Sequence, residues 1–313
     1  MKGLYNQEVH EYSDMSEHLN IVSGWTRQIK NGQQPRGTDL HDHLTLIHNH
    51  NAGFTEALAW SCRDVNGKNS YELLADIIDP SCHGNVLDLA CGSGVLLDYC
   101  NERFGSKLKL SGIDMNDAEL ILARERLAHT DTKLHRGMAQ DLGFMADSTV
   151  DVILCHWALT LMDPVVPVFL SVERVLREGG VFAALVDGDP NTAPGYLEIS
   201  KIIYKYVQRQ YPDYGAIELG DPRIRTMEGL NELAMHTFID PDITITPGLV
   251  SLNAAPEILA RQVAGFFYAS FVLSVTGHSQ MIDDLENYFC ARLNNGLSCF
   301  VMPINRLIVR KNK

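Results

Sequence analysis

The chain lacks the features that would place it in a membrane or on a nucleic acid. No apolar run approaches the ~20 residues of a membrane-spanning helix, and the first thirty residues lack a signal-peptide profile. The 26 lysines and arginines are outnumbered by 39 aspartates and glutamates, which gives a net charge of −13. Binding along a duplex or an RNA needs a cationic surface. The sequence therefore predicts no membrane and no nucleic-acid partner.

Paired cysteines and metal-ligand spacings are also missing. The seven cysteines are odd in number and show no paired spacing, which predicts reduced thiols and a cytoplasmic location. Four of the 12 histidines lie within ten residues, as His41, His43, His48 and His50, but no cysteine or glutamate completes a metal-ligand spacing. The favoured expectation is therefore that this cluster binds no metal, although a metal site stays among the alternatives. Three interpretations remain open: a metal site, substrate contact through His41 and His43, or a polar loop.

From residue 84 onward, strand-like and helix-like segments alternate. This alternation is typical of βαβ units and predicts an α/β fold with a mostly parallel sheet. The expected strands lie at 86–90, 108–114, 133–137, 150–155, 180–187, 243–250 and 298–311. The expected helices lie at 14–29, 55–62, 70–78, 94–104, 117–128, 165–177, 196–210, 226–236, 256–274 and 279–294.

The most informative stretch is Val-Leu-Asp-Leu-Ala-Cys-Gly-Ser-Gly at 86–94. An apolar strand carries Asp88 near its end, and Gly92 and Gly94 follow in one tight turn, where glycine lets a ligand approach the backbone closely. The next predicted helix points its first N–H groups at that ligand. A dinucleotide would require a third glycine where Leu97 stands, and a phosphate would be repelled by the carboxylate. The pattern favours a ligand with a positive charge or an amino group.

This loop resembles the first motif of class I S-adenosylmethionine-dependent methyltransferases, usually Asp/Glu-x-Gly-x-Gly-x-Gly, with Ala90 in place of the first glycine. The turn at 172–180, Val-Glu-Arg-Val-Leu-Arg-Glu-Gly-Gly, is similar to another motif of that family. The resemblance covers about residues 70–190 and is to small-molecule enzymes of the ubiquinone-biosynthesis type. It implies S-adenosylmethionine as cofactor and a Rossmann-like, seven-stranded, mostly parallel sheet with an antiparallel last strand. N-terminal helices and an inserted helical cap are expected beside that sheet.

On this basis we divide the chain into four segments. Residues 1–80 are expected to form an N-terminal helical lid, and 81–190 the cofactor-binding core. Residues 191–240 would be the inserted cap, and 241–313 the C-terminal part of the core with a helical insertion.

Asp114 is the strongest candidate for the ribose. It ends the second predicted strand, where a carboxylate can accept hydrogen bonds from both hydroxyls. The alternative is a helix N-cap, which we assign to Asp117 instead. The resemblance implies an adenine contact after the third strand, here from Gln140, Asp141 and Leu142. The other expected cofactor contacts are Asp88, Ala90, Cys91, Gly92, Gly94, Met115 and Tyr12, the last resembling a tyrosine that relatives lay over the cofactor, with helix packing as the alternative.

His156 and Trp157 follow the fourth predicted strand, on the sheet edge where ligands lie in open α/β folds. His156 is the candidate catalytic base, since imidazole titrates near neutral pH, and a histidine of the 41–50 cluster is the other candidate to take the proton. The alternative is that it only shapes the pocket, because positioning alone can drive methyl transfer. Trp157, together with Tyr204 of the aromatic cap, is expected to contact the substrate, with core packing as the alternative for Tyr204.

We therefore expect a cytoplasmic S-adenosylmethionine-dependent methyltransferase. Its acceptor would be a small molecule methylated on oxygen, nitrogen or carbon in specialised metabolite biosynthesis, and a homodimer is left open. One alternative is a cofactor-binding protein that transfers no methyl group or uses the cofactor for another reaction. The other is a protein or tRNA methyltransferase.

Overall fold

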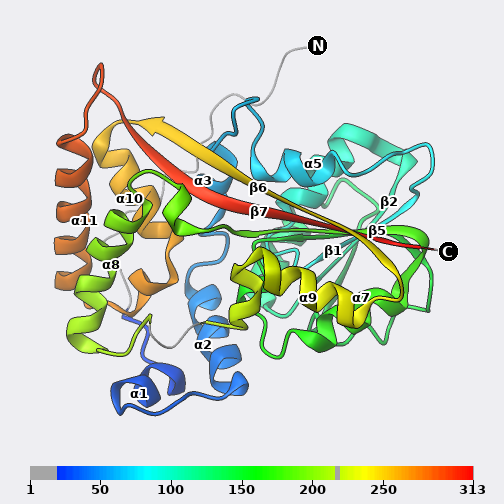
Figure 1. Cartoon of the computed structure of the whole chain (residues 1–313), viewed down its shortest axis with the longest axis horizontal. Helices are drawn as coiled ribbons and strands as arrows, with labels where there is room; N and C mark the ends of the chain where they lie inside the picture. The colour runs from blue at the N-terminus through cyan, green and yellow to red at the C-terminus, as the bar shows by residue number, and fades with distance from the viewer. Residues whose placement is uncertain (1–19, 216–218, 313) are drawn as a thin grey trace.

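A single seven-stranded sheet of order β3-β2-β1-β4-β5-β7-β6 forms the centre of the computed structural model, which describes residues 20–215 and 219–312 (Figure 1). Strands β1 to β5 pair in parallel, whereas β7 runs antiparallel to both β5 and β6. This confirms the predicted mostly parallel sheet with its antiparallel last strand. The strands are β1 (Asn85–Leu89), β2 (Lys109–Asp114), β3 (Lys133–Arg136), β4 (Val150–His156), β5 (Leu176–Asp187), β6 (Pro241–Ala254) and β7 (Ser298–Lys311).

Both faces of the sheet are buried. Side chains alternate between the two faces along each central strand, and helices cover each face. Val86 and Val152 belong to one hydrophobic cluster, and their neighbours Leu87 and Ile153 belong to the other. Helices α7 (Val166–Val175) and α9 (Met227–Thr237) cover the second face, while α4 (Ser70–Ala75), α5 (Val95–Phe104) and α6 (Asp117–Arg126) cover the first. The sequence of a central strand such as 86–90 is therefore apolar at neighbouring positions, apart from Asp88, and does not alternate between apolar and polar residues.

The remaining helices gather at one end of the sheet, on the left of Figure 1. They are α1 (Gly24–Lys30), α2 (Gly37–His50), α3 (Glu56–Ser61), α8 (Tyr196–Gln210), α10 (Pro256–Phe266) and α11 (Val275–Cys290). One hydrophobic cluster contains Leu44, Val86, Ile199 and Leu259, one from each predicted segment. The four segments are thus joined by a common core. Short 3-10 helices connect the elements: η2 (Gly105–Lys107), η3 (Leu159–Leu161), η4 (Pro190–Thr192), η5 (Pro222–Arg225) and η6 (Tyr268–Val272).

Three local predictions need correction. The histidine-rich segment is helix α2 and not a loop. The helix expected over 256–274 ends at Phe266, where Phe267 turns to extended backbone before η6. The N-cap of α6 is Asn116 rather than Asp117, since the Asn116 side chain accepts hydrogen bonds from the backbone N–H groups of Ala118 and Glu119.

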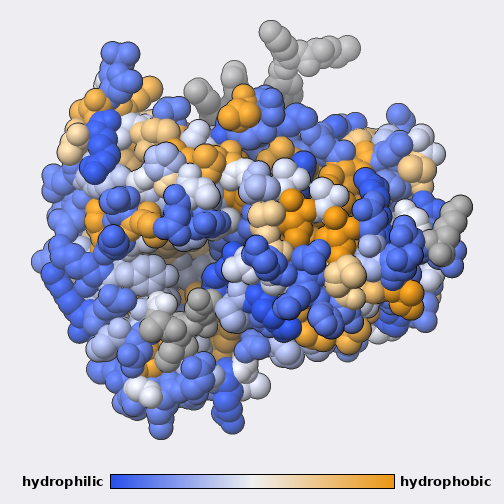
Figure 2. Space-filling model, in the orientation of Figure 1, coloured by the Kyte–Doolittle hydropathy of each residue, from blue (hydrophilic) through white to orange (hydrophobic). Residues whose placement is uncertain are grey.

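The face seen in Figure 2 is mainly hydrophilic, with hydrophobic side chains in smaller patches between charged ones. Across the described ranges, no helix combines the length and apolar character needed to cross a membrane. All seven cysteines are free thiols in the structure.

Candidate cofactor and acceptor site

The glycine loop follows β1 through three residues in the left-handed region. Ala90, Gly92 and Gly94 have φ angles of +58°, +51° and +82°. A Cβ at position 94 would lie 3.0 Å from the Leu127 side chain and 3.2 Å from that of Ala123, so glycine there lets α6 pack closely. Gly94 itself does not line the cavity beside the loop, whereas Ala90 and Gly92 do. The structure therefore gives Gly94 a packing role, and its contact with a ligand stays a prediction.

Two carboxyl groups end the neighbouring strands β1 and β2. The Asp114 carboxylate accepts hydrogen bonds from the Gly92 N–H at 2.9 Å and the Asn116 N–H at 2.8 Å. The Asp88 side chain is buried, and its Oδ1 atom has no hydrogen-bond partner among the described residues. Burial raises the pKa of both carboxyls, and for Asp88 the nearby Asp114 charge adds to the effect. A ligand with hydrogen-bond donors and positive charge would relieve both groups.

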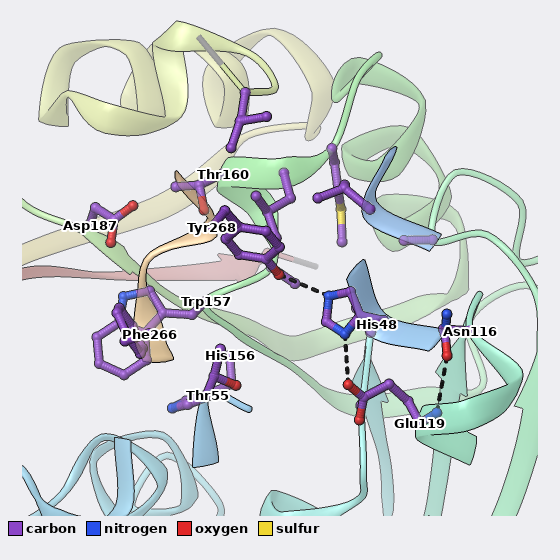
Figure 3. Close-up of a pocket in the computed structure, with 18 of the residues that line it drawn as sticks. His48, Thr55, Asn116, Glu119, His156, Trp157, Thr160, Asp187, Phe266 and Tyr268 are labelled. Atoms are coloured by element: carbon purple, nitrogen blue, oxygen red, sulfur yellow. Dashed lines mark hydrogen bonds and ion pairs between the residues drawn. The ribbon is translucent and has the colours of Figure 1, made fainter. Parts of the chain in front are cut away.

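One cavity of about 510 Å³ extends from these carboxyls to an aromatic chamber. Figure 3 shows Trp157 and Phe266 of this chamber. Its first half, which we call the cofactor half, is lined by Asp88, Ala90, Cys91, Gly92, Asp114 and Met115. Its second half, the acceptor half, is lined by Trp157, Asp187, Tyr196, Tyr204, Phe266 and Phe267. The cavity lies at the carboxyl ends of β1, β2, β4 and β5, the place where open α/β sheets bind ligands.

The loop after β3 meets the cavity earlier in the chain than the sequence indicated. Met138, Ala139 and Gln140 line it. Asp141 is exposed and accepts a hydrogen bond from the Gly143 N–H at 2.9 Å, while Leu142 is fully buried in the core. Because the apolar Leu142 anchors the loop, the preceding carboxylate turns to solvent. The predicted adenine contacts of Asp141 and Leu142 are corrected accordingly.

His156 lies at the end of β4 and lines the cavity. Its ring stacks on Tyr71 with centroids 4.1 Å apart, and its Nε2 atom is 2.8 Å from the Ser70 hydroxyl. Burial lowers the pKa of His156 to about 3. An imidazole with so low a pKa is a weak base, so the structure favours the alternative in which His156 shapes the pocket.

Trp157 and Tyr204 line the cavity, where the sequence predicted substrate contacts. The Trp157 ring meets Phe266 edge to face, with centroids 5.5 Å apart. Asp187, at the end of β5, is a lining residue that sequence reasoning missed. Burial raises its pKa, while the Arg225 charge and the Trp157 indole N–H act in the opposite direction. The signal that could have identified Asp187 in the sequence is its position at the end of a predicted parallel strand, where ligands bind in α/β folds.

The four clustered histidines separate on helix α2. His41 and His48 are seven residues apart, share one face and line the cavity. His43 is fully buried elsewhere: it stacks on Trp25 at 4.9 Å, and its Nδ1 atom is 3.0 Å from the Ser23 hydroxyl. The predicted substrate contact of His43 is therefore wrong, because a helix turns residues 41 and 43 to opposite sides. His50 is exposed.

His48 joins Tyr268, from an aromatic stretch of the sequence, and Glu119, which the sequence did not single out. Its Nδ1 atom is 2.7 Å from Glu119 Oε1 and its Nε2 atom is 2.9 Å from the Tyr268 hydroxyl, as Figure 3 shows. Glu119 comes from α6 and Tyr268 from η6. Glu119 is 71 residues from His48 in the sequence and Tyr268 is 220 residues from it, so no sequence pattern relates the three positions.

A second polar group ties the N-terminal helices to the glycine loop. The Arg126 guanidinium pairs with the Glu56 carboxylate at 2.7 Å and donates to the Ser93 carbonyl at 2.6 Å. The predicted contact from Tyr12 lies outside the described residues. Within the ranges 20–215 and 219–312, no three histidine, cysteine, aspartate or glutamate side chains are grouped to hold a metal ion.

Comparison with known proteins agrees with this geometry. A family model described as a methyltransferase domain matches residues 86–180. A demethylmenaquinone methyltransferase from Listeria welshimeri is 26% identical over 161 residues, which cover 48% of this chain and 66% of that protein. For one from Listeria monocytogenes serotype 4a the identity is 28%, covering 39% of this chain and 52% of that protein. The chain thus spans about half to two thirds of the length of these relatives.

Solved structures share the fold at low identity. A putative methyltransferase from Bacillus halodurans aligns with a TM-score of 0.52 and 14% identity, covering 78% of this chain and 99% of that one. A phosphoethanolamine N-methyltransferase from Haemonchus contortus, in complex with S-adenosylhomocysteine, aligns with a TM-score of 0.51 and 16% identity, covering 89% and 61%. The fold and the glycine-loop site define a Rossmann-like methyltransferase domain. Residues 86–180 therefore form a domain similar to that of the class I S-adenosylmethionine-dependent methyltransferases.

Proposed function

We propose that this protein transfers the methyl group of S-adenosylmethionine to a small-molecule acceptor held in the acceptor half of the cavity. One observation carries the proposal: a single cavity joins the glycine loop to the aromatic side chains of Trp157 and Phe266. A donor in one half and an acceptor in the other would meet without an intervening wall. A protein that only bound the cofactor would not need the aromatic chamber.

The cofactor half fits S-adenosylmethionine by the chemistry of its residues. Asp88 offers a buried carboxylate oxygen that has no partner in the described structure, which suits a cationic or amino group. Asp114 keeps lone pairs free for ribose hydroxyls while it holds Gly92. We assign cofactor contact to these residues, to Ala90, Cys91 and Met115, and to Gln140 of the loop after β3.

The acceptor half fits a planar, largely apolar molecule. Trp157, Tyr196 and Phe266 present ring surfaces to it, and Tyr204 lies in the same wall. Flat aromatic side chains bury a planar ligand at low entropic cost, and a few polar groups orient it. Asp187 and His41 are such groups here. The bacterial relatives are named for demethylmenaquinone, an acceptor of this planar kind.

When bound, S-adenosylmethionine supplies an electrophilic methyl group on a sulfonium. The residues of the chain bind and orient the two reactants and exclude water, and positioning of this kind can lower a barrier by roughly 7–11 kcal/mol. We assign His156 to shaping the pocket, because its pKa of about 3 keeps the ring neutral and weakly basic.

Methyl transfer from labelled S-adenosylmethionine to a panel of quinols, phenols and amines tests the proposal, with isothermal titration of the cofactor run in parallel. We expect binding together with a labelled product. Binding without any labelled product would favour the alternative of a cofactor-binding protein, and labelled RNA or protein would favour a macromolecular acceptor. We also propose that the protein is cytoplasmic, that it acts in specialised metabolite biosynthesis and that it forms a homodimer. Native mass spectrometry reports the subunit number.

A further inference from the structure

Three polar side chains from distant parts of the chain form a connected line beside the cavity. Glu119, His48 and Tyr268 are joined by hydrogen bonds of 2.7 and 2.9 Å (Figure 3). All three line the cavity. The Glu119 side chain is only 4% exposed and that of His48 19% exposed, so the interaction is little screened by water.

The hydrogen-bond pattern gives this line a direction. Glu119 Oε1 also accepts a hydrogen bond from the Gly53 N–H at 3.0 Å, so it acts as an acceptor toward His48 as well. That arrangement assigns the proton to His48 Nδ1 and leaves the Nε2 lone pair to accept from the Tyr268 hydroxyl. The oxygen of Tyr268 is therefore the end of the line that can take up a proton, because its own proton can pass to His48.

Tyr268 lies between His48 on one side and Trp157 and Phe266 on the other, as Figure 3 shows. Burial raises its pKa well above the usual range, and the charges of Glu119, Asp114 and Asp187 all add to that effect. Asp114 belongs to the cofactor half and Asp187 to the acceptor half, so charges from both halves raise the pKa of the Tyr268 hydroxyl. Glu119 reaches the glycine loop, since its Oε2 atom is 3.7 Å from the position of a Cβ on Gly92. The line thus runs from the glycine loop, beside Glu119, to Tyr268 on the side of Trp157 and Phe266.

We propose that Tyr268, backed by His48 and Glu119, removes the proton from a hydroxyl group on a planar acceptor during methyl transfer. This inference rests on the proposed function and narrows its acceptor to phenols, quinols and enols. Tyr268 is the catalytic residue that touches the acceptor, and His48 and Glu119 are positioning residues that act through it.

The step balances in protons and electrons. The proton of the acceptor hydroxyl moves to the Tyr268 oxygen as the Tyr268 proton moves to His48 Nε2. The acceptor oxygen, or the ring carbon conjugated with it, uses the released electron pair to bond the methyl carbon, and the pair of the broken carbon–sulfur bond stays on sulfur. The positive charge lost at sulfur equals that gained at His48, beside Glu119, and the proton then leaves to solvent.

The test uses 4-nitrophenol, whose ionised form absorbs visible light, added to the full chain saturated with S-adenosylhomocysteine so that no transfer occurs. Asp114 and Asp187 face the relay as carboxyl groups and would by themselves keep a bound phenol neutral. We expect instead about a tenfold larger ratio of ionised to neutral nitrophenol on the protein than in solution. Tyr268→Phe and His48→Gln should abolish the increase, and Glu119→Gln should reduce it.

Tyr206→Phe is the matched control, since it removes a tyrosine hydroxyl that binds Asp284 away from the cavity. It should leave the ionisation ratio unchanged. Unaltered ionisation on the wild-type protein, an increase that survives Tyr268→Phe, or no binding of nitrophenol would each overturn the proposal. Increased ionisation without methyl transfer to any acceptor would contradict the proposed function while supporting the relay. Methyl transfer to phenols without increased ionisation would support the proposed function and contradict the relay.

Discussion

The Asp114 carboxylate accepts a hydrogen bond from the Gly92 N–H at 2.9 Å, so the end of β2 holds the loop that follows β1. Its other oxygen accepts from the Asn116 N–H, which begins α6. A single buried carboxylate therefore links the glycine loop, the proposed ribose site and the helix that carries Glu119. Cofactor binding and loop geometry should depend on it together.

Replacing Asp114 with alanine should weaken S-adenosylmethionine binding at least tenfold, because it removes a charge-assisted contact worth more than about 1.4 kcal/mol. Isothermal titration measures the effect. Asp141→Ala is the control, since that carboxylate faces solvent. Equal losses in both variants would restore the adenine contact that the sequence indicated for Asp141.

Ala90→Gly should raise the free energy of unfolding by up to about 1 kcal/mol. Ala90 has φ +58°, where a Cβ costs roughly 1–2 kcal/mol, and the extra freedom of glycine in the unfolded chain offsets part of the gain. Urea denaturation measures it. Ala123→Gly, inside α6, should lower stability by about 1 kcal/mol or more. A loss at both positions would show that Ala90 is not strained.

His43 should make the protein less stable in acid. Burial lowers its pKa to about 4, below the ~6.5 of an unfolded chain, so the unfolded state binds more protons between these values. The free energy of unfolding should therefore fall as pH drops from about 6.5 to 4, by up to about 3 kcal/mol from this residue. Urea denaturation of wild type and His43→Gln across this range isolates the contribution. Parallel pH dependences in the two proteins would contradict it.

His156→Asn should leave the shape of the pH–rate profile between pH 5 and 8 unchanged. The pKa of His156 is about 3, so its ring does not titrate in that range. We expect a rate loss that is matched by weaker cofactor binding, as for a pocket wall. Loss of an acidic limb from the profile of kcat/KM, with cofactor affinity intact, would identify His156 as the base.

The strands, the glycine loop and the carboxyl at the end of β2 could be predicted because each depends on local pattern. A buried parallel strand needs an apolar run, and a left-handed turn favours glycine. His43 and Asp141 were misplaced for the opposite reason. Their side-chain directions depend on whether the segment is helical and on which neighbour, such as Leu142, is anchored in the core.

The sequence by itself predicted the fold class, the expected cofactor and the place where the cofactor half of the site begins, since these predictions depend on residues close together in the chain. The sequence also indicated Trp157 and Tyr204 for the acceptor half, but only the tertiary structure added Asp187 and Phe266 to it, because these residues come from separate elements that meet only after the sheet has formed. The tertiary structure also decided the Glu119–His48–Tyr268 line, whose members come from α6, α2 and η6. Hydrogen bonds across such separations depend on packing, and no local periodicity records them.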